Sequence, residues 1–196
     1  RGGIVVVAVW MAVTNIVFWR RLRRERKEFA LPEEMEAVFC HKTDKAAVRK
    51  RKRSMRIYVA DRLSSPCLYG LPGREAIYLT PDIAEDMVRL RHVLTHELCH
   101  RRQGDSFWSV VRSVLVAVYW MNPLVWVAAV LSKRDCELAC DEAAIKMLGE
   151  KERISYGETL LSIIVRKGRL SDIACTATTM TGSGRSIKER IGFIAG

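Results

Sequence analysis

The stretch His96-Glu97-Leu98-Cys99-His100 decides how the rest of the chain is interpreted. It lies inside residues 87–102, where apolar residues recur at helical spacing, so this region is predicted to be a helix. Two histidines four residues apart lie on one helix face, and the glutamate after the first histidine projects near the same site. Neutral imidazoles bind Zn²⁺, and a carboxylate beside the metal acts as a general base on water. The motif therefore predicts a hydrolytic zinc site with His96 and His100 as ligands and Glu97 as the base.

A hydrolytic zinc site needs a third protein ligand, because one coordination position stays open for water. Residues 135–142 offer such a ligand on a later helix, where Glu137 and Asp141 are four apart and share a face. We predict that Glu137 is the third ligand and that Asp141 accepts a hydrogen bond from the distal nitrogen of a ligand histidine. Weaker candidates, interpreted as core thiols or surface imidazoles, are Cys99, Cys136, Cys140, His41 and His92.

The N-terminal part of the chain is an apolar run over residues 4–19 that ends abruptly in the basic cluster of residues 20–27. At about 1.5 Å per residue, this run is slightly shorter than a bilayer core of roughly 30 Å. We expect residues 1–20 to be an N-terminally truncated transmembrane helix rather than a buried core helix. A signal peptide fits less well because the basic cluster comes after the apolar run, and the positive-inside rule then places the rest of the chain in the cytoplasm.

The formal net charge of +11 is concentrated in residues 1–56, which contain 15 basic and 6 acidic residues. We interpret residues 21–55 as a basic cytoplasmic juxtamembrane segment, either simply solvated or touching anionic lipid headgroups or an acidic partner. Direct nucleic-acid binding is not expected, because no reading helix or interleaved aromatic residues accompany the charge. Six cysteines without a Cys-x-x-Cys pair indicate free thiols in a reducing compartment.

Residues 56–196 are predicted to form the metallopeptidase domain, mainly α with a small β-sheet. Two β-type runs, residues 57–59 and 76–79, are predicted strands joined by the turn-forming residues 64–73. Their edge could accept an extended substrate as a further strand, or the sheet could simply cover the metal helix. Thr80-Pro81-Asp82 predicts the start of a helix.

A second strongly apolar stretch, residues 107–131, contains Arg112 as its only charge. Asn122-Pro123 divides it, so the sequence predicts two helices, at about 107–121 and 123–148. We predict that the apolar helices of residues 107–131 are membrane-associated, and the sequence leaves open whether they span the bilayer. The remaining predicted elements are a helix over residues 156–165, a loop over 168–184 and a short closing helix over 186–194.

These motifs resemble the BlaR/MecR-type family of membrane-embedded gluzincin zinc metallopeptidases, the antibiotic-sensor signal-transducer proteases. The resemblance covers residues 56–194, and the preceding apolar helix has the expected place. The blocks at 120–126 and 137–141 are far more specific than the zinc motif alone. The stretches that carry the resemblance are Arg91 to His100, Trp120-Met121-Asn122-Pro123-Leu124-Val125-Trp126, Glu137-Leu138-Ala139-Cys140-Asp141, Ser65-Pro66-Cys67-Leu68-Tyr69-Gly70, Ser155-Tyr156-Gly157-Glu158-Thr159-Leu160-Leu161 and Lys188-Glu189-Arg190-Ile191.

The resemblance implies a gluzincin-like zinc metalloprotease domain in the cell membrane, located after a transmembrane helix and facing the cytoplasm. Proteins of this family relay an extracellular antibiotic or envelope signal by cleaving a repressor and often themselves. The implied partners are therefore a repressor-like protein substrate, the chain itself and membrane lipid. The implied roles are Zn²⁺ ligation by His96, His100 and Glu137, base catalysis by Glu97 and support of a ligand by Asp141.

In the mechanism that we expect, Glu97 takes a proton from the attacking water and passes it to the leaving nitrogen. The oxyanion that forms needs a second stabiliser besides zinc, and Tyr156 or Arg190 could provide it or could serve packing alone. The sequence is also compatible with two other functions. The chain could be a zinc-bound signalling scaffold without turnover, or a membrane-tethered nucleic-acid binder that uses residues 20–56.

Overall fold

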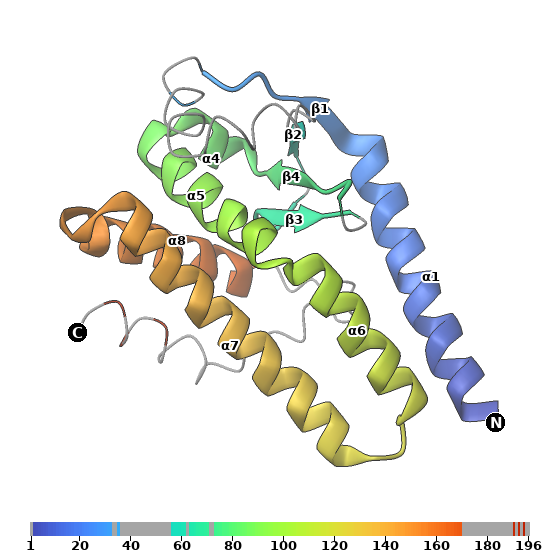
Figure 1. Cartoon of the computed structure of the whole chain (residues 1–196). Helices are drawn as coiled ribbons and strands as arrows, with labels where there is room; N and C mark the ends of the chain where they lie inside the picture. The colour runs from blue at the N-terminus through green and yellow to red at the C-terminus, as the bar shows by residue number, and fades with distance from the viewer. Residues whose placement is uncertain are drawn as a thin grey trace.

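The computed structural model of the chain describes residues 2–32, 35, 56–61, 63–70, 73–169, 190, 192 and 194. This part is mostly helical with one four-stranded sheet, which confirms the predicted α+β class (Figure 1). Residues 36–55, which include His41, and residues 170–189 lie outside the described residues, so the predictions made for them stay predictions. The elements are α1 (Gly2–Glu25), β1 (Arg26–Glu28), β2 (Arg56–Ala60), β3 (Cys67–Tyr69), β4 (Ala76–Leu79), α4 (Pro81–Glu85), α5 (Met87–Gln103), α6 (Asp105–Val118), α7 (Pro123–Leu148), the 3₁₀ turn η1 (Glu150–Glu152) and α8 (Arg153–Arg169).

The sheet has the strand order β1-β2-β4-β3, and its connectivity corrects one prediction. The two predicted strands are parallel neighbours, with Ile57 opposite Ile77, and a tight turn cannot join parallel strands. The chain instead passes through β3, inside the predicted turn of residues 64–73, and β3 pairs antiparallel with β4. β1 pairs antiparallel with β2 at the other edge. The prediction of two strands joined directly by a turn was therefore wrong.

The central strands bury both of their faces, because side chains alternate along each strand. On one face Ile77 and Leu79 pack against Leu90 and Leu94 of α5, all four of which are almost completely buried. On the other face lie Tyr58, Ala76 and Tyr78, against which Leu22 of α1 packs. The sheet thus connects the N-terminal helix to the helix that carries the metal motif.

α5 is the central helix of the structure, because it is buried on more than one side. One side covers the sheet, and the opposite side packs against α7 and α8 through the cluster Cys99, Cys140, Ala144, Ile145, Tyr156, Leu160 and Ile194. Asp86 caps its N-terminus by accepting hydrogen bonds from two backbone N–H groups, and Gly104, at φ 75°, ends it in a left-handed conformation. The prediction for residues 87–102 is confirmed to within one residue.

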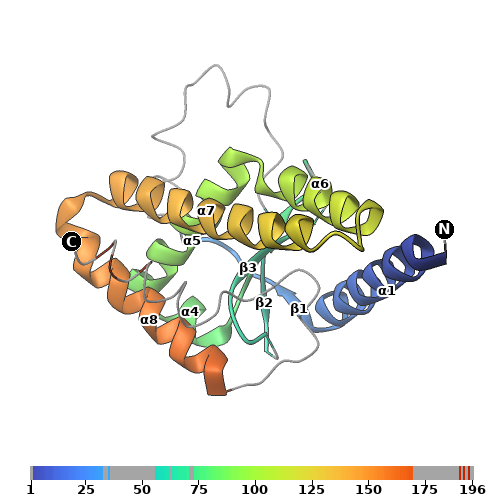
Figure 2. The ribbon, with the colours of Figure 1, turned by 90° about the horizontal axis from the view of Figure 1, so that it is seen from below.

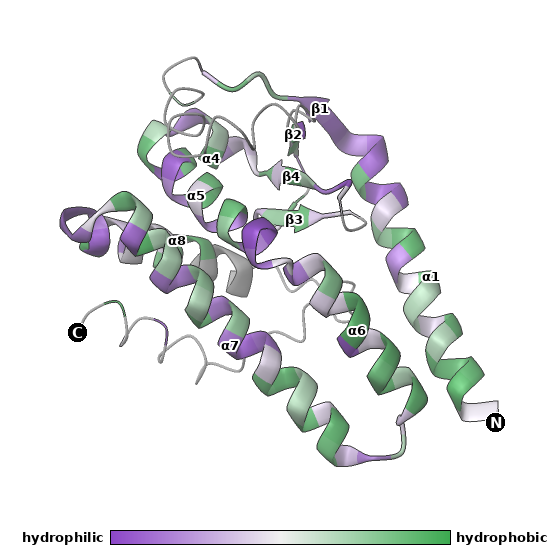
Figure 3. Cartoon of the chain, in the orientation of Figure 1, coloured by the Kyte–Doolittle hydropathy of each residue, from purple (hydrophilic) through white to green (hydrophobic). Residues whose placement is uncertain are grey.

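Three apolar helical segments extend away from the sheet in the same direction in both views (Figures 1 and 2). They are α1, α6 and the first half of α7, and hydrophobic residues dominate their outer parts (Figure 3). The side chain of Asn122 accepts a hydrogen bond from the Leu124 N–H and caps α7, with Pro123 at its first position, as predicted.

α1 is long and apolar enough to cross a membrane, and within the described residues it alone passes this test. It continues past residue 20 to Glu25, so the first part of the basic cluster is helical and the next three residues form β1. It lies beside α6, and Gly3 is so near the Trp120 ring that a Cβ would not fit there. This close approach packs the N-terminal end of α1 against the turn between α6 and α7.

Candidate metal centre

The two motif histidines project from the face of α5 that is turned towards α7. Their Nε2 atoms are 3.0 Å apart, and the two rings meet edge to face with their centroids 4.6 Å apart. This convergence results from the helical spacing of four residues, which places one side chain directly above the other. Both rings are largely buried. The sheet side of the same helix holds apolar residues such as Leu90 and Leu94, so the core fixes which face carries the histidines.

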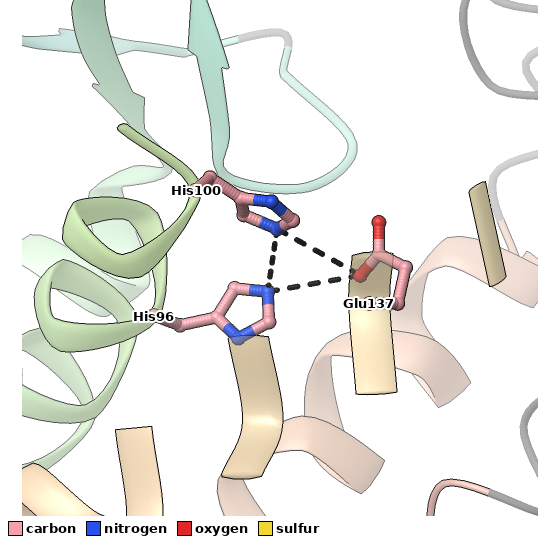
Figure 4. A group of neighbouring side chains, drawn as sticks. All are labelled: His96, His100 and Glu137. Carbon is pink, nitrogen blue, oxygen red and sulfur yellow. Dashed lines mark hydrogen bonds and ion pairs between the residues drawn. The ribbon is translucent and has the colours of Figure 1, made fainter. Parts of the chain in front are cut away.

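Glu137 of α7 joins the pair of histidines from the facing helix (Figure 4). Its Oε2 atom is 3.7 Å from Nε2 of His96 and 3.9 Å from Nε2 of His100. The two imidazoles and the carboxylate therefore point one donor atom each towards a common centre, as Figure 4 shows. The structure brings together the three residues that were predicted as ligands.

The donor set and its spacing fit a zinc ion. Two imidazole nitrogens and one carboxylate oxygen are a typical set for a catalytic zinc site, which leaves a fourth position for water or substrate. Ligand bonds of about 2.0–2.1 Å in tetrahedral geometry separate the donor atoms by roughly 3.3 Å. The separations found here, from 3.0 to 3.9 Å, bracket that value. A metal ion would need only small side-chain adjustments at this place.

The second nitrogen of His96 is held on the side away from Glu137. Its Nδ1 lies 2.8 Å from the Tyr156 hydroxyl and 3.2 Å from Oδ1 of Asp141, to which that hydroxyl donates at 2.7 Å. With Nε2 turned to a metal, Nδ1 carries the proton and donates it to these oxygens, which fixes the tautomer and the ring orientation. These distances are compatible with the supporting role predicted for Asp141.

Arg190 closes the group from the C-terminal part of the chain. Its Nε and one terminal nitrogen donate to the two oxygens of Asp141 at 2.7 and 2.9 Å, and another terminal nitrogen is 3.2 Å from Oε2 of Glu137. The Tyr156 hydroxyl likewise donates to Asp141. The polar groups of both predicted oxyanion stabilisers are thus engaged with Asp141, and this geometry favours a supporting role for them.

His100 has its own partner, which the sequence reasoning missed. Its Nδ1 lies 2.6 Å from Oδ2 of Asp105, the first residue of α6, and 3.2 Å from the Cys140 sulfur. Gly104 reverses the chain and brings Asp105 back onto the end of α5. Burial would raise the pKa of Asp105, but the neighbouring His100 outweighs burial and lowers it. The sequence signal that could have indicated Asp105 is its position directly after Gly104, the glycine that ends the motif helix.

The electrostatics of the metal-free centre favour a cation. Burial alone would lower the pKa of His96, but the carboxylates of Asp141 and Glu137 outweigh it and raise this pKa to about 10. Burial would raise the pKa of Glu137, but His96, His100 and Arg190 lower it well below its usual range. Two ionised carboxylates thus face a site that either a proton on His96 or a metal ion can neutralise.

Glu97, the predicted base, is buried on α5 and lies between the two histidines in the sequence. Among the residues that the structure describes, its carboxylate has no hydrogen-bond or ion-pair partner. Its catalytic role stays a prediction.

Two of the weaker ligand candidates also have defined places. His92 is fully buried, with Nδ1 2.8 Å from the Thr159 hydroxyl and Nε2 3.2 Å from Oε2 of Glu152, so its interpretation as a surface imidazole was wrong. Cys140 is a buried core thiol, as predicted, but it touches the outer nitrogen of His100. None of the four described cysteines, Cys67, Cys99, Cys136 and Cys140, forms a disulfide.

Comparisons with known proteins identify the family of the chain. The model of the family described as BlaR1 peptidase M56 matches residues 2–194. The methicillin resistance mecR1 protein of Staphylococcus aureus is 28% identical over 147 residues, which cover 74% of this chain and 25% of that protein. The regulatory protein BlaR1 of Bacillus licheniformis is 35% identical over 130 residues, which cover 66% of this chain and 21% of that protein.

The chain spans a quarter or less of the length of these curated relatives. Almost the whole chain, including the apolar helix α1 and the centre formed by α5 and α7, falls within the matched family region. The chain therefore belongs to the BlaR1 peptidase M56 family of metallopeptidases.

Proposed function

We propose that the protein is a membrane-anchored, cytoplasm-facing zinc endopeptidase that cleaves a regulatory, repressor-like protein and also the chain itself. The observation that carries this proposal is the convergence of His96, His100 and Glu137 on one centre, where the two histidines come from the helix that also carries the buried Glu97. Membership of a metallopeptidase family supports the reaction class. The names of the relatives, a methicillin resistance protein and a regulatory protein, support a place in antibiotic signalling.

The chain's own groups prepare the centre for peptide hydrolysis. A zinc ion held by the three ligands would polarise the substrate carbonyl and lower the pKa of the attacking water. Asp105 keeps His100 in the tautomer that turns Nε2 to the centre, and Asp141 with Tyr156 does the same for His96. Glu97 then accepts the proton of the water and delivers it to the leaving nitrogen.

The edge strand β3 is the feature that favours a protein substrate over a small molecule. It is the edge strand of the sheet on the side of β4, and it packs beside α5. Its outer backbone groups could pair with an extended peptide, which would then run past the metal helix. Such pairing recognises backbone, so side-chain pockets or a second binding surface would have to select the substrate.

The apolar helices support attachment to the membrane. α1 has the length and composition of a span, and the arginines at its end favour the cytoplasmic side for the sheet and the metal helix. Large apolar side chains on α6 and the start of α7 are exposed, and α6 lies beside α1. We infer that the hairpin of residues 107–131 enters the bilayer next to α1. The sheet and the metal centre then lie at the membrane surface.

The test is metal analysis together with a cleavage assay in lipid nanodiscs. Wild type is expected to hold one zinc per chain and to cleave itself or a co-expressed cognate repressor, whereas Glu97→Gln keeps the zinc and loses cleavage. Glu142→Gln, on the exposed side of α7, is the matched control and should behave as wild type. Zinc without any cleavage by wild type would support the scaffold function instead. Salt-sensitive DNA binding that survives zinc removal would support the nucleic-acid binder.

A further inference from the structure

The C-terminal part of the chain contributes a charged group to the metal centre. Arg190 is separated from α8 by residues outside the described part, yet its guanidinium lies against α7. It makes a bidentate contact with the two carboxylate oxygens of Asp141, and one of its terminal nitrogens lies 3.2 Å from Oε2 of Glu137. The arginine side chain is 14% exposed, so these contacts are made in a largely buried environment.

A separate set of contacts fixes the same segment to α8. The backbone carbonyl of Ile194 accepts a hydrogen bond from Nε of Arg153 at 2.7 Å. The Ile194 side chain is buried, and an added Cβ at Gly157 would come within 2.9 Å of it. The placement of Ile194 therefore depends on α8, whereas that of Arg190 depends on the carboxylates of α7.

The charge of Arg190 has a structural reason. Asp141 is fully buried, and burying an ionised carboxylate is costly unless a cation and hydrogen bonds compensate it. The planar guanidinium matches both carboxylate oxygens at once. Glu137 differs, because it is partly exposed and its Oε2 can bind a metal while it forms an ion pair with Arg190.

We propose that Arg190 is a positioning residue for the metal ligands and that its docking, together with that of Ile194, completes the zinc site. The guanidinium orients Glu137 directly. Through Asp141 and the Tyr156 hydroxyl it also fixes the ring of His96. Undocking of the segment from α8 leaves Glu137 and His96 less ordered and lowers the affinity for zinc. This inference rests on the proposed function only in requiring that the centre binds zinc.

A purely structural role would give a different result. If Arg190 only neutralised Asp141, its removal would destabilise the fold, and the chains that remain folded would bind zinc normally. Zinc affinity and metal-free stability must therefore be measured separately on the same samples. Variants at Arg153 and Gly157 are informative because they loosen the segment without touching either carboxylate.

The experiment is a zinc competition titration against a chromogenic chelator, with the full chain in nanodiscs and thermal melting of the metal-free form in parallel. Arg190→Met is expected to weaken zinc binding about 10- to 100-fold. Arg190→Lys should restore it only in part, because a lysine cannot make the bidentate contact. Arg153→Met and Gly157→Ala should weaken it by a smaller factor. Lys146→Met, which removes an exposed positive charge from α7, is the control and should change nothing.

Wild-type zinc affinity in folded Arg190→Met would overturn the inference. If that variant does not fold, unchanged affinity in both Arg153→Met and Gly157→Ala would overturn it instead. If wild type binds zinc tightly, neither of these two results contradicts the proposed function. Failure of wild type itself to bind zinc would overturn the proposed function and the inference with it.

Discussion

Replacing Asp105 tests whether the residue behind His100 tunes the metal centre. The Asn side chain has nearly the same volume, and its amide oxygen can still accept the proton of Nδ1. The 2.6 Å contact therefore survives in Asp105→Asn, but the negative charge is lost. In Asp105→Ala the hydrogen bond is lost as well. A hydrogen bond to a charged group contributes about 1.5–3 kcal/mol, and about 1.4 kcal/mol corresponds to a factor of ten in affinity.

We therefore expect zinc affinity to fall by about tenfold in Asp105→Asn and by roughly 100-fold in Asp105→Ala. The assay is the same zinc competition titration, at pH 7.5 and fixed ionic strength. Asp86→Ala is the matched control, because Asp86 also lies at an end of α5 but contacts only the backbone N–H groups of Val88 and Arg89 and the Arg89 side chain, not a predicted ligand. It should cost about 1 kcal/mol of stability and leave zinc affinity unchanged. Wild-type affinity in both Asp105 variants would refute the reasoning.

Three further predictions concern pH, the core and the apolar hairpin. Burial alone would lower the pKa of His96, but the carboxylates of Asp141 and Glu137 raise it to about 10 in the metal-free fold. The stabilisation from its proton is therefore complete below about pH 6.5 and is lost as pH rises towards 10, which melting curves of the metal-free chain would reveal. Leu90→Ala empties a buried position between α5 and the sheet and should cost about 2–5 kcal/mol in denaturant titrations, with zinc stoichiometry unchanged in the folded fraction. Asn122→Ala removes the cap of α7 and should lower stability by about 0.5–2 kcal/mol in lipid, while Asn122→Ser should restore most of it.

The sequence predicted the helices well because their limits depend on local chemistry. Asn122-Pro123 fixes the start of α7 through a side-chain cap, and Gly104 ends α5 through its left-handed conformation. Glu137 was predicted as a ligand from its place on a later helix, and the structure brings it to the histidines. Its catalytic partners and their roles stay predictions until they are tested.

The sheet was harder to predict because its strands depend on distant partners. β3 has only three residues, and β1 is made of the charged residues Arg26–Glu28, so neither shows the alternating pattern of a strand. The parallel pairing of β2 and β4 is set by α5 and α1 covering the two faces, which no local signal encodes. Asp105 was not predicted for the same reason, since its contact with His100 depends on the change of chain direction at Gly104.

The continuity of α1 and β1 has a mechanical consequence. Glu25 is the last residue of the helix and Arg26 the first of the strand, so no flexible linker separates α1 from the sheet. The Tyr69 hydroxyl also donates to the Asn15 carbonyl, and the Phe18 ring meets Tyr69 edge to face. If α1 spans the bilayer as proposed, its rotation or axial shift would displace the sheet as one stiff unit, and with it α5, which the sheet supports.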